Sequence, residues 1–139
     1  MTINSRKHTL ETALGACLAG DATQLQQYFT DDVVGWSPNM LVGSLADLRD
    51  SVADRDGALS DIEVDVTGVD VIGNKGYLEY TVSAVFSGPF TIDENTVVEP
   101  SGETIRIGAA LCADFTGDKI SAFRNYFDDA ALLEQMLLT

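Results

Sequence analysis

The sequence is poor in basic residues and in histidine. Its 139 residues include 22 Asp and Glu against 8 Lys and Arg, which gives a formal net charge of −14. A charge of this sign repels phosphate backbones and anionic lipid surfaces, so we expect no nucleic acid and no membrane as a partner. The single histidine, His8, lies in a polar N-terminal stretch. Neither a histidine-based metal site nor a Ser/His/Asp triad is therefore predicted.

Cysteines and glycine-rich phosphate loops are also scarce. Cys17 and Cys112 lie far apart, each within an apolar pattern, and their separation does not match a metal-ligand spacing. Both are interpreted first as small core residues. The Gly-Asn-Lys-Gly run at residues 73–76 is typical of a hairpin turn and not of a nucleotide-binding loop. We therefore predict neither a metal nor a cofactor.

Long apolar runs are missing as well. Apolar residues make up 45% of the chain, as in an ordinary globular protein, and no run approaches the roughly 20 residues that span a bilayer. Residues 1–8 are polar and lack the apolar stretch of a secretion signal, so we expect a cytoplasmic protein. The length fits a single domain over residues 1–139.

Helical periodicity dominates the first third of the chain. Apolar residues at helical spacing predict a helix over residues 9–19. Asp21 and Gln24 have the spacing of a capping box, which predicts a second helix. A third helix is predicted to begin at Ser44 and to end near residues 55–57.

After residue 60 the apolar residues alternate as in strands. Their parity slips at residues 67–68, which predicts a β-bulge and hence a strongly bent strand. A second strand is predicted over residues 77–86. Residues 87–102 carry two of the three prolines and several acids, and we interpret them as an exposed hairpin excursion. Two further strands and a terminal helix complete the predicted order.

Small side chains mark one face of the strand predicted over residues 104–115. They are those of Gly108, Ala110 and Cys112. Such residues indicate either a closely packed helix backbone or an open cavity, and we favour the cavity. The next strand carries Phe123, Asn125 and Phe127 on one face. We predict a mostly apolar cavity between these two sets, with Trp36 closing one side.

Residues 28–38, which read YFTDDVVGWSP, and residues 117–133 near the end resemble the SnoaL-like branch of the nuclear transport factor 2-like superfamily. The resemblance covers nearly the whole chain. It implies an α+β cone, in which N-terminal helices pack on a strongly bent, mixed but mostly antiparallel sheet around a pocket.

In function, the resemblance implies a small-molecule pocket protein. It would be either a cofactor-independent cyclase, isomerase or hydrolase acting on an apolar cyclic or polyketide-like compound, or a relative that only binds its ligand. The alternative is an interaction module that pairs through its open sheet face. Because the outward face of the late strands would leave a large apolar patch in water, we also expect a homodimer.

The residues that act in well-known relatives are mostly absent here. Ser37 stands where ketosteroid isomerase-like members carry a carboxylate base, and a serine without an adjacent histidine is a poor base. Asn125 corresponds to an aspartate of limonene epoxide hydrolase-like members, whose arginine and second aspartate fall near Tyr80 and Val82. Steroid-type enolisation and epoxide hydrolysis are therefore both disfavoured.

Two residues of the C-terminal part are candidate catalytic groups. Asn125 could orient a water or a carbonyl, but it cannot take a proton. The resemblance to SnoaL-like cyclases implies an acid/base role for Asp128 in an intramolecular ring closure. Asp128 also precedes the terminal helix, where a carboxylate commonly accepts hydrogen bonds from the first free amides, and we favour this N-cap interpretation.

Four further residues are candidate ligand contacts, namely Trp36, Tyr80, Cys112 and Phe123. Trp36 is the only tryptophan, and a filler of the core or rim is the alternative role for it. Tyr80 is compatible with either the core or the cavity. The expected ligand is a small apolar molecule.

Overall fold

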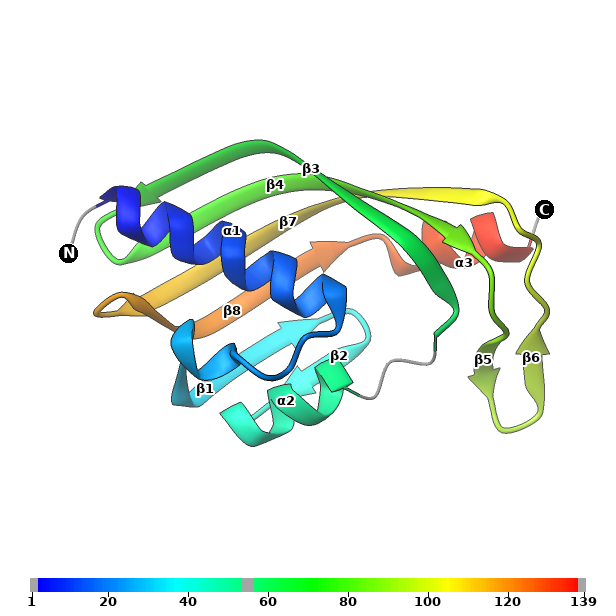
Figure 1. The fold of residues 1–139 in the computed structure, drawn as a ribbon, viewed down its shortest axis with the longest axis horizontal. Helices are drawn as coiled ribbons and strands as arrows, with labels where there is room; N and C mark the ends of the chain where they lie inside the picture. The colour runs from blue at the N-terminus through cyan, green and yellow to red at the C-terminus, as the bar shows by residue number, and fades with distance from the viewer. Residues whose placement is uncertain (1–2, 54–56, 138–139) are drawn as a thin grey trace.

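The protein is an α+β cone in which two helices cover the concave face of one curved sheet (Figure 1). The computed structural model describes residues 3–53 and 57–137. The elements, in chain order, are α1 (Ile3–Ala19), the 3-10 turn η1 (Leu25–Gln27), β1 (Phe29–Ser37), β2 (Met40–Val42), α2 (Leu45–Ala53), β3 (Leu59–Ile72), β4 (Lys75–Phe86), β5 (Phe90–Asp93), β6 (Thr96–Val98), β7 (Thr104–Thr116), β8 (Lys119–Phe127) and α3 (Asp129–Leu137).

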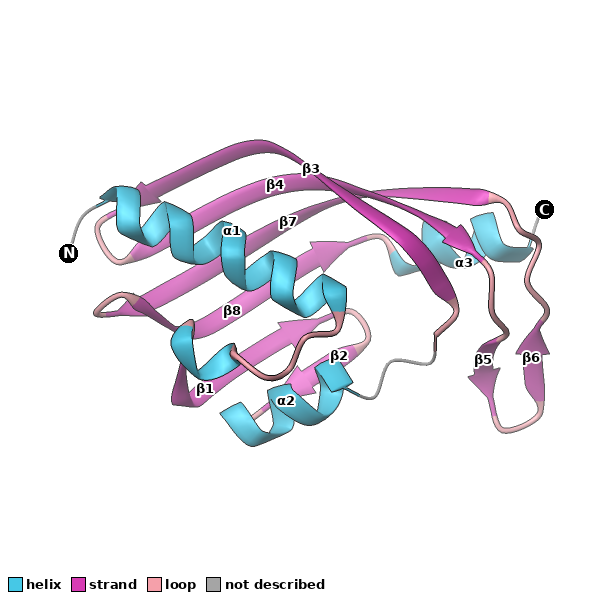
Figure 2. Cartoon of the chain, viewed as in Figure 1, coloured by secondary structure: helices cyan, strands magenta, loops and turns pink. Residues whose placement is uncertain are grey.

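The main sheet has the order β2-β1-β8-β7-β4-β3. Strands β1 and β8 run parallel, and the other neighbouring pairs are antiparallel. The mixed, mostly antiparallel sheet predicted from the sequence is thus confirmed. Strands β5 and β6 form a separate hairpin that projects from one end of the molecule, as predicted for residues 87–102 (Figure 2).

Helix α1 ends where the sequence predicts and begins earlier. Gly20 has a φ of 75°, and its amide and that of Asp21 donate to the carbonyls of Cys17 and Ala16, which is a Schellman C-cap. The start lies at Ile3 and not at residue 9.

Arg6 accounts for the early start of α1. Its guanidinium donates to the carbonyl oxygens of Gly117, at 3.1 Å, and Gly73, at 2.6 Å, and lies over the Phe115 ring. These two glycines belong to hairpin turns distant in sequence. The polar first turns are therefore held by tertiary contacts that helical periodicity does not report.

The predicted second helix is wrong. Only the single turn η1 forms, and Gln24 makes no side-chain capping bond. The Asp21 carboxylate instead accepts hydrogen bonds from the backbone amide and hydroxyl of Thr23, at 3.1 and 2.6 Å. A side chain that bonds two residues ahead favours a turn over a helix.

The third helix begins as predicted. The Ser44 hydroxyl accepts a hydrogen bond at 3.1 Å from the backbone amide of Asp47. In turn, the Asp47 carboxylate accepts one from the backbone amide of Gly43. The buried stripe of α2 consists of Leu45, Leu48 and Val52. Its predicted end, near residues 55 and 56, lies outside the described residues.

Bulges bend the longest strand, β3. The register between β3 and β4 shifts between Val66 and Gly68, which confirms the bulge predicted there. A second shift lies between Ser60 and Glu63, where Asp61 has a positive φ of 50°. Because bulges kink a strand and increase its twist, β3 is strongly bent along its length (Figure 1).

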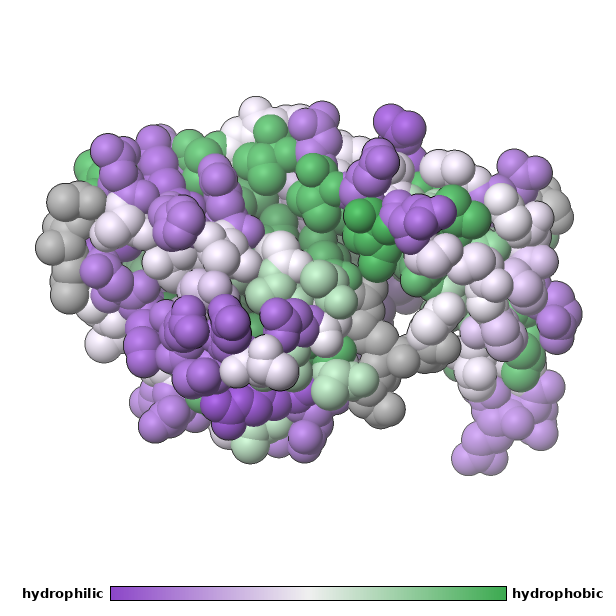
Figure 3. Space-filling model, in the orientation of Figure 1, coloured by the Kyte–Doolittle hydropathy of each residue, from purple (hydrophilic) through white to green (hydrophobic). Residues whose placement is uncertain are grey.

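The buried side chains form two clusters. The larger one joins α1 and α2 to the concave face of the sheet, with Leu10, Leu25 and Leu48 almost fully buried. The smaller one lies around Phe86 and includes Met136 of α3. Between them, the middle of β3 presents apolar atoms at the surface (Figure 3), where Val64 and Val66 are partly exposed.

Among the described residues, no helix has the length and apolarity needed to cross a bilayer.

The packing of Phe123 on Gly35 generates the first prediction. A Cβ at residue 35 would lie 2.1 to 2.6 Å from three ring atoms of Phe123. Gly35→Ala should therefore lower the free energy of unfolding by about 1–3 kcal/mol, because the ring must move. Urea denaturation followed by circular dichroism measures this loss.

Gly108→Ala is the matched control. A Cβ at residue 108 would meet no described atom within 4 Å, and glycine within a strand is less stable than alanine by about 0.5–1 kcal/mol. This variant should be as stable as the parent or more so. Equal losses in the two variants would contradict the packing argument.

Candidate functional site

A cavity of about 610 Å³ lies between the two helices and the concave face of the sheet. The residues that line it come from α1, α2, β1, β2, β7 and β8, and they are Ala13, Leu14, Cys17, Leu18, Phe29, Ser37, Asn39, Met40, Leu48, Ser51, Val52, Leu111, Ile120, Phe123, Asn125 and Phe127. Small-molecule sites commonly have this volume and this excess of apolar side chains over polar ones.

Polar groups in the cavity wall are few and uncharged. They are the amides of Asn39 and Asn125, the hydroxyls of Ser37 and Ser51, and the Cys17 thiol. Among the described lining residues there is no carboxylate, imidazole, ammonium or guanidinium group. Within residues 3–53 and 57–137, no three His, Cys, Asp or Glu side chains gather as metal ligands would. The described walls are therefore suited to a neutral, largely apolar molecule.

Asn125 accepts a hydrogen bond from a buried tyrosine that lies on the same face of the sheet, across β7. The Tyr80 hydroxyl donates to Asn125 Oδ1 at 2.8 Å, and Tyr80 is only 3% exposed. Tyr80 lies beside Ala109 in the β4–β7 register, and Asn125 lies beside Leu111 in the β7–β8 register. Burial raises the pKa of the Tyr80 phenol, and the hydrogen bond to Asn125 offsets only part of that rise. The phenol is therefore a protonated donor at neutral pH.

A second hydroxyl and amide pair lies where the chain leaves β1. Ser37 is buried, and its hydroxyl donates to Asn39 Oδ1 at 3.0 Å. Sequence reasoning missed Asn39. The available signal was the resemblance to ketosteroid isomerase-like members, which implies a functional position at Ser37, two residues before Asn39.

Helical residues in the wall were missed for a different reason. Leu14, Cys17, Leu48 and Val52 belong to apolar stripes that also face the core, so their spacing cannot distinguish a cavity wall from packed interior. Of the residues proposed from the sequence, Phe123, Asn125 and Phe127 line the cavity, and Tyr80 contacts Asn125 across β7.

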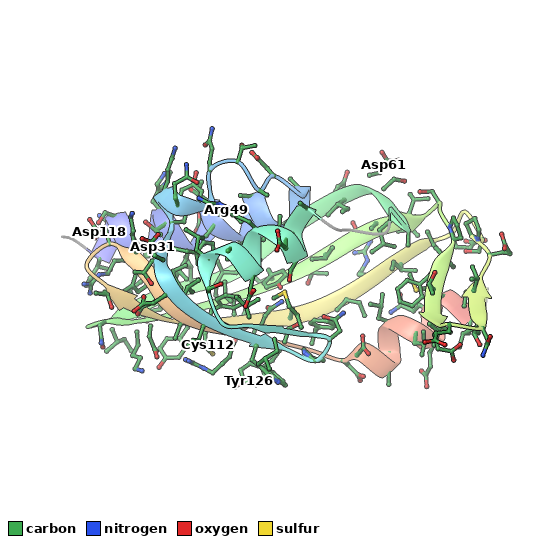
Figure 4. All side chains as sticks on the ribbon, turned by 90° about the horizontal axis from the view of Figure 1, so that it is seen from below. Asp31, Arg49, Asp61, Cys112, Asp118 and Tyr126 are labelled. Atoms are coloured by element: carbon green, nitrogen blue, oxygen red, sulfur yellow. The ribbon has the colours of Figure 1, made fainter. Side chains whose placement is uncertain are left out.

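The predicted face of β7 is wrong. Leu111 lines the cavity, whereas Gly108, Ala110 and Cys112 lie on the opposite, outer face of the sheet. Figure 4 shows Cys112 and Tyr126 pointing away from the helical layer. The helices pack on the face of β7 that carries its larger side chains. The face with the small side chains is the outer one, which the helices do not cover. Cys112 therefore does not contact the cavity.

Trp36 also lies on the outer face and does not close the cavity. Its ring centroid lies 5.3 Å from that of Tyr126, and the side chain is 41% exposed. In the parallel β1–β8 register Gly35 pairs with Phe123 on the inner side, so Trp36, one residue on, points outward. The placement expected for Trp36 is thus corrected by the strand register.

Asp128 is the N-cap of α3. Its carboxylate accepts a hydrogen bond at 3.0 Å from the amide of Ala131, three residues ahead. The residue is exposed and is not among those that line the cavity. The structure therefore places Asp128 in the helix-capping position and away from the cavity wall.

Comparisons with known proteins agree with this architecture. The family model for SnoaL-like polyketide cyclases matches residues 8–136. Among solved structures, AclR from Streptomyces galilaeus is 20% identical with a TM-score of 0.79, covering 99% of each chain. A SnoaL-like polyketide cyclase from Agrobacterium tumefaciens is 14% identical with a TM-score of 0.70, covering 98% of this chain and 99% of the other.

An epoxide hydrolase of the LEH-like type from M. tuberculosis is also 14% identical, with a TM-score of 0.72, and covers 98% of this chain and 92% of the other. No curated protein matches the chain by sequence. At these identities the solved structures establish the shared fold alone.

The capping role of Asp128 generates the second prediction. Asp128→Ala should lower the free energy of unfolding by about 0.5–2 kcal/mol, and Asp128→Asn should change it little, because asparagine caps nearly as well. Chemical denaturation of the three proteins measures this. Any activity or ligand binding should survive Asp128→Asn. A variant of unchanged stability that loses all turnover would instead identify Asp128 as an acid/base.

Proposed function

Because this chain belongs to the SnoaL-like polyketide cyclase family, we propose that it is a small-molecule pocket protein for a neutral, apolar cyclic or polyketide-like compound. The cavity of about 610 Å³ carries this proposal, since its walls are mainly apolar and converge on a few uncharged polar groups. The net charge of −14 supports a neutral ligand over an anionic one, because a strongly acidic protein repels anions.

The cavity supports ligand binding more strongly than it supports catalysis. The described wall offers no carboxylate or imidazole to act as a general base, and the buried Tyr80 phenol keeps its proton. A cofactor-independent cyclase, isomerase or hydrolase built on this site would work mainly by orienting and enclosing its substrate. Epoxide hydrolysis is the weakest of these options, because Asn125 cannot activate water by removing a proton.

A second proposal concerns the outer face of the sheet. Exposed apolar and aromatic side chains gather there, namely Val34, Trp36, Leu41, Tyr77 and Tyr126. Large exposed apolar patches mark protein interaction sites. We propose that this face pairs with a second copy of the chain to form a homodimer. An interaction module without a ligand would use the same face.

Ligand stabilisation is the third prediction. Anthrone, androstenedione and limonene represent aromatic polyketide, steroid and terpene skeletons, and a bound ligand stabilises the folded state by mass action. At a ligand concentration of 100 times Kd the gain is about 2.7 kcal/mol. At least one of the three should raise the midpoint of thermal unfolding.

Ser51→Trp tests whether that ligand occupies the cavity. Ser51 lines the cavity from α2 and is exposed. Tryptophan at this position should therefore obstruct the cavity and reduce the ligand-induced rise in unfolding temperature, without removing a buried side chain. Ala46→Trp on the same helix is the control, since Ala46 is exposed and is not a lining residue. No stabilisation by any of the three compounds would favour the interaction module.

Dimerisation is the fourth prediction. Sedimentation velocity at micromolar concentration should give a species of about twice the 14.9 kDa chain mass. Trp36→Asp should shift it toward the monomer, because a charge would be buried in the interface. Val97→Asp is the control, since Val97 is a similarly exposed apolar residue on the β5–β6 hairpin. A single species of monomer mass for the unmodified protein would defeat the proposal.

A further inference from the structure

We propose that Asn125 presents its amide N–H groups to the cavity as a binding site for a carbonyl oxygen of the ligand, and that Tyr80 is the positioning residue that fixes this orientation. This inference rests on the proposed binding function and specifies the chemistry of the ligand. A side-chain amide has one acceptor and two donors, and which end faces the cavity decides what the site can bind.

The acceptor end of Asn125 faces Tyr80. Asn125 Oδ1 accepts the hydrogen bond of the Tyr80 hydroxyl at 2.8 Å, from the direction of β4, where Tyr80 is buried. The Nδ2 group lies at the other end of the planar amide. Asn125 lines the cavity and Tyr80 does not, so the donor end is the one left for a ligand.

Reversing the amide would leave a buried donor without its partner. If Nδ2 faced Tyr80, the phenol hydrogen would lose Oδ1 as its acceptor, and a buried donor without an acceptor is costly. Burial also raises the pKa of Tyr80, so the phenol stays a donor across the neutral range. Tyr80 can reach Asn125 because β7 places the small Ala109 beside it.

The second amide of the cavity has the same bias. Asn39 Oδ1 accepts the hydroxyl of Ser37 at 3.0 Å, which again leaves the amide N–H groups for a ligand. Asn39 is exposed, whereas Asn125 belongs to the central strand β8. Both amides therefore favour acceptor oxygens. The ligand class that fits is a neutral ring compound with a ketone or quinone oxygen.

A matched pair of probes tests this chemistry. 1-Tetralone and tetralin share one ring skeleton and differ in a single carbonyl group. The unmodified protein should bind 1-tetralone about tenfold more tightly, the order expected for one hydrogen bond within a desolvated site. In ¹⁵N-resolved NMR spectra, the Asn125 side-chain amide signals should shift further with 1-tetralone than with tetralin.

Two substitutions assign the roles of the residues. Asn125→Asp replaces the amide donor by a carboxylate of the same shape that only accepts, so the preference for the ketone should disappear while tetralin still binds. Tyr80→Phe removes the positioning hydroxyl and should reduce the preference toward parity, again with little change for tetralin. Tyr77→Phe, at an exposed tyrosine on the outer face, is the control and should retain the preference.

The binding of 1-tetralone and tetralin distinguishes a failure of the carbonyl-binding inference from a failure of the proposed small-molecule binding function. Equal binding of the two probes by the unmodified protein would overturn the inference and leave the binding function in place. Binding of neither probe, together with no stabilisation by the three larger ligands, would overturn both. If Tyr80→Phe does not fold, the NMR comparison on the unmodified protein and the Asn125→Asp variant still decide whether the amide is the donor.

Discussion

Curvature of the long strands is the constraint on which the cavity depends. Strands β3, β4 and β7 have 14, 12 and 13 residues, and β-bulges are a common means of curving strands of this length. The bulge between Val66 and Gly68 bends β3, and β4 and β7 follow it through their continuous pairing. Helices α1 and α2 pack on the concave side of this curved sheet, and the cavity lies between them and the strands β1, β2, β7 and β8.

Side-chain hydrogen bonds complete the sheet where its strands stop. Beyond Phe127, β8 no longer pairs with β7, and the side chain of Gln135 on α3 takes its place. The Gln135 amide accepts from the backbone N–H of Arg106 and donates to its C=O, both at 2.8 Å, as a neighbouring strand would. Asp128 begins the same helix, so its carboxylate is explained by the need to end β8 and start α3.

The two faces of the sheet carry different chemistry. The inner face bears Phe123, Asn125 and the buried Tyr80, and its polar groups bond to one another in an apolar wall. The outer face bears exposed aromatic residues beside an ion pair between Lys75 and Asp114 at 2.6 Å. The proposed ligand site and the proposed dimer interface therefore lie on separate surfaces, so a substitution in one can be made without changing the other.

The sequence by itself determined the features that depend on neighbouring residues. Gly20 ends α1 because glycine adopts a positive φ without strain, Ser44 begins α2, and the slip in alternation near Gly68 locates the bulge. The resemblance to the SnoaL-like branch identified the fold, and alternation along β8 placed Phe123 and Asn125 on one face. The local sequence could not exclude a second helix after Asp21, because an aspartate at this position can either cap a helix or form an Asx turn.

Only the tertiary structure decided which face of the sheet encloses the cavity. Alternation assigns residues to two faces but does not say which of them the helices cover, so Cys112 and Trp36 were expected on the wrong side. The choice is made by long-range packing, in which α1 and α2 bury the face that carries Leu111 and Phe123. The same packing brings Tyr80 to Asn125 across β7, a contact between residues 45 positions apart that no local pattern contains.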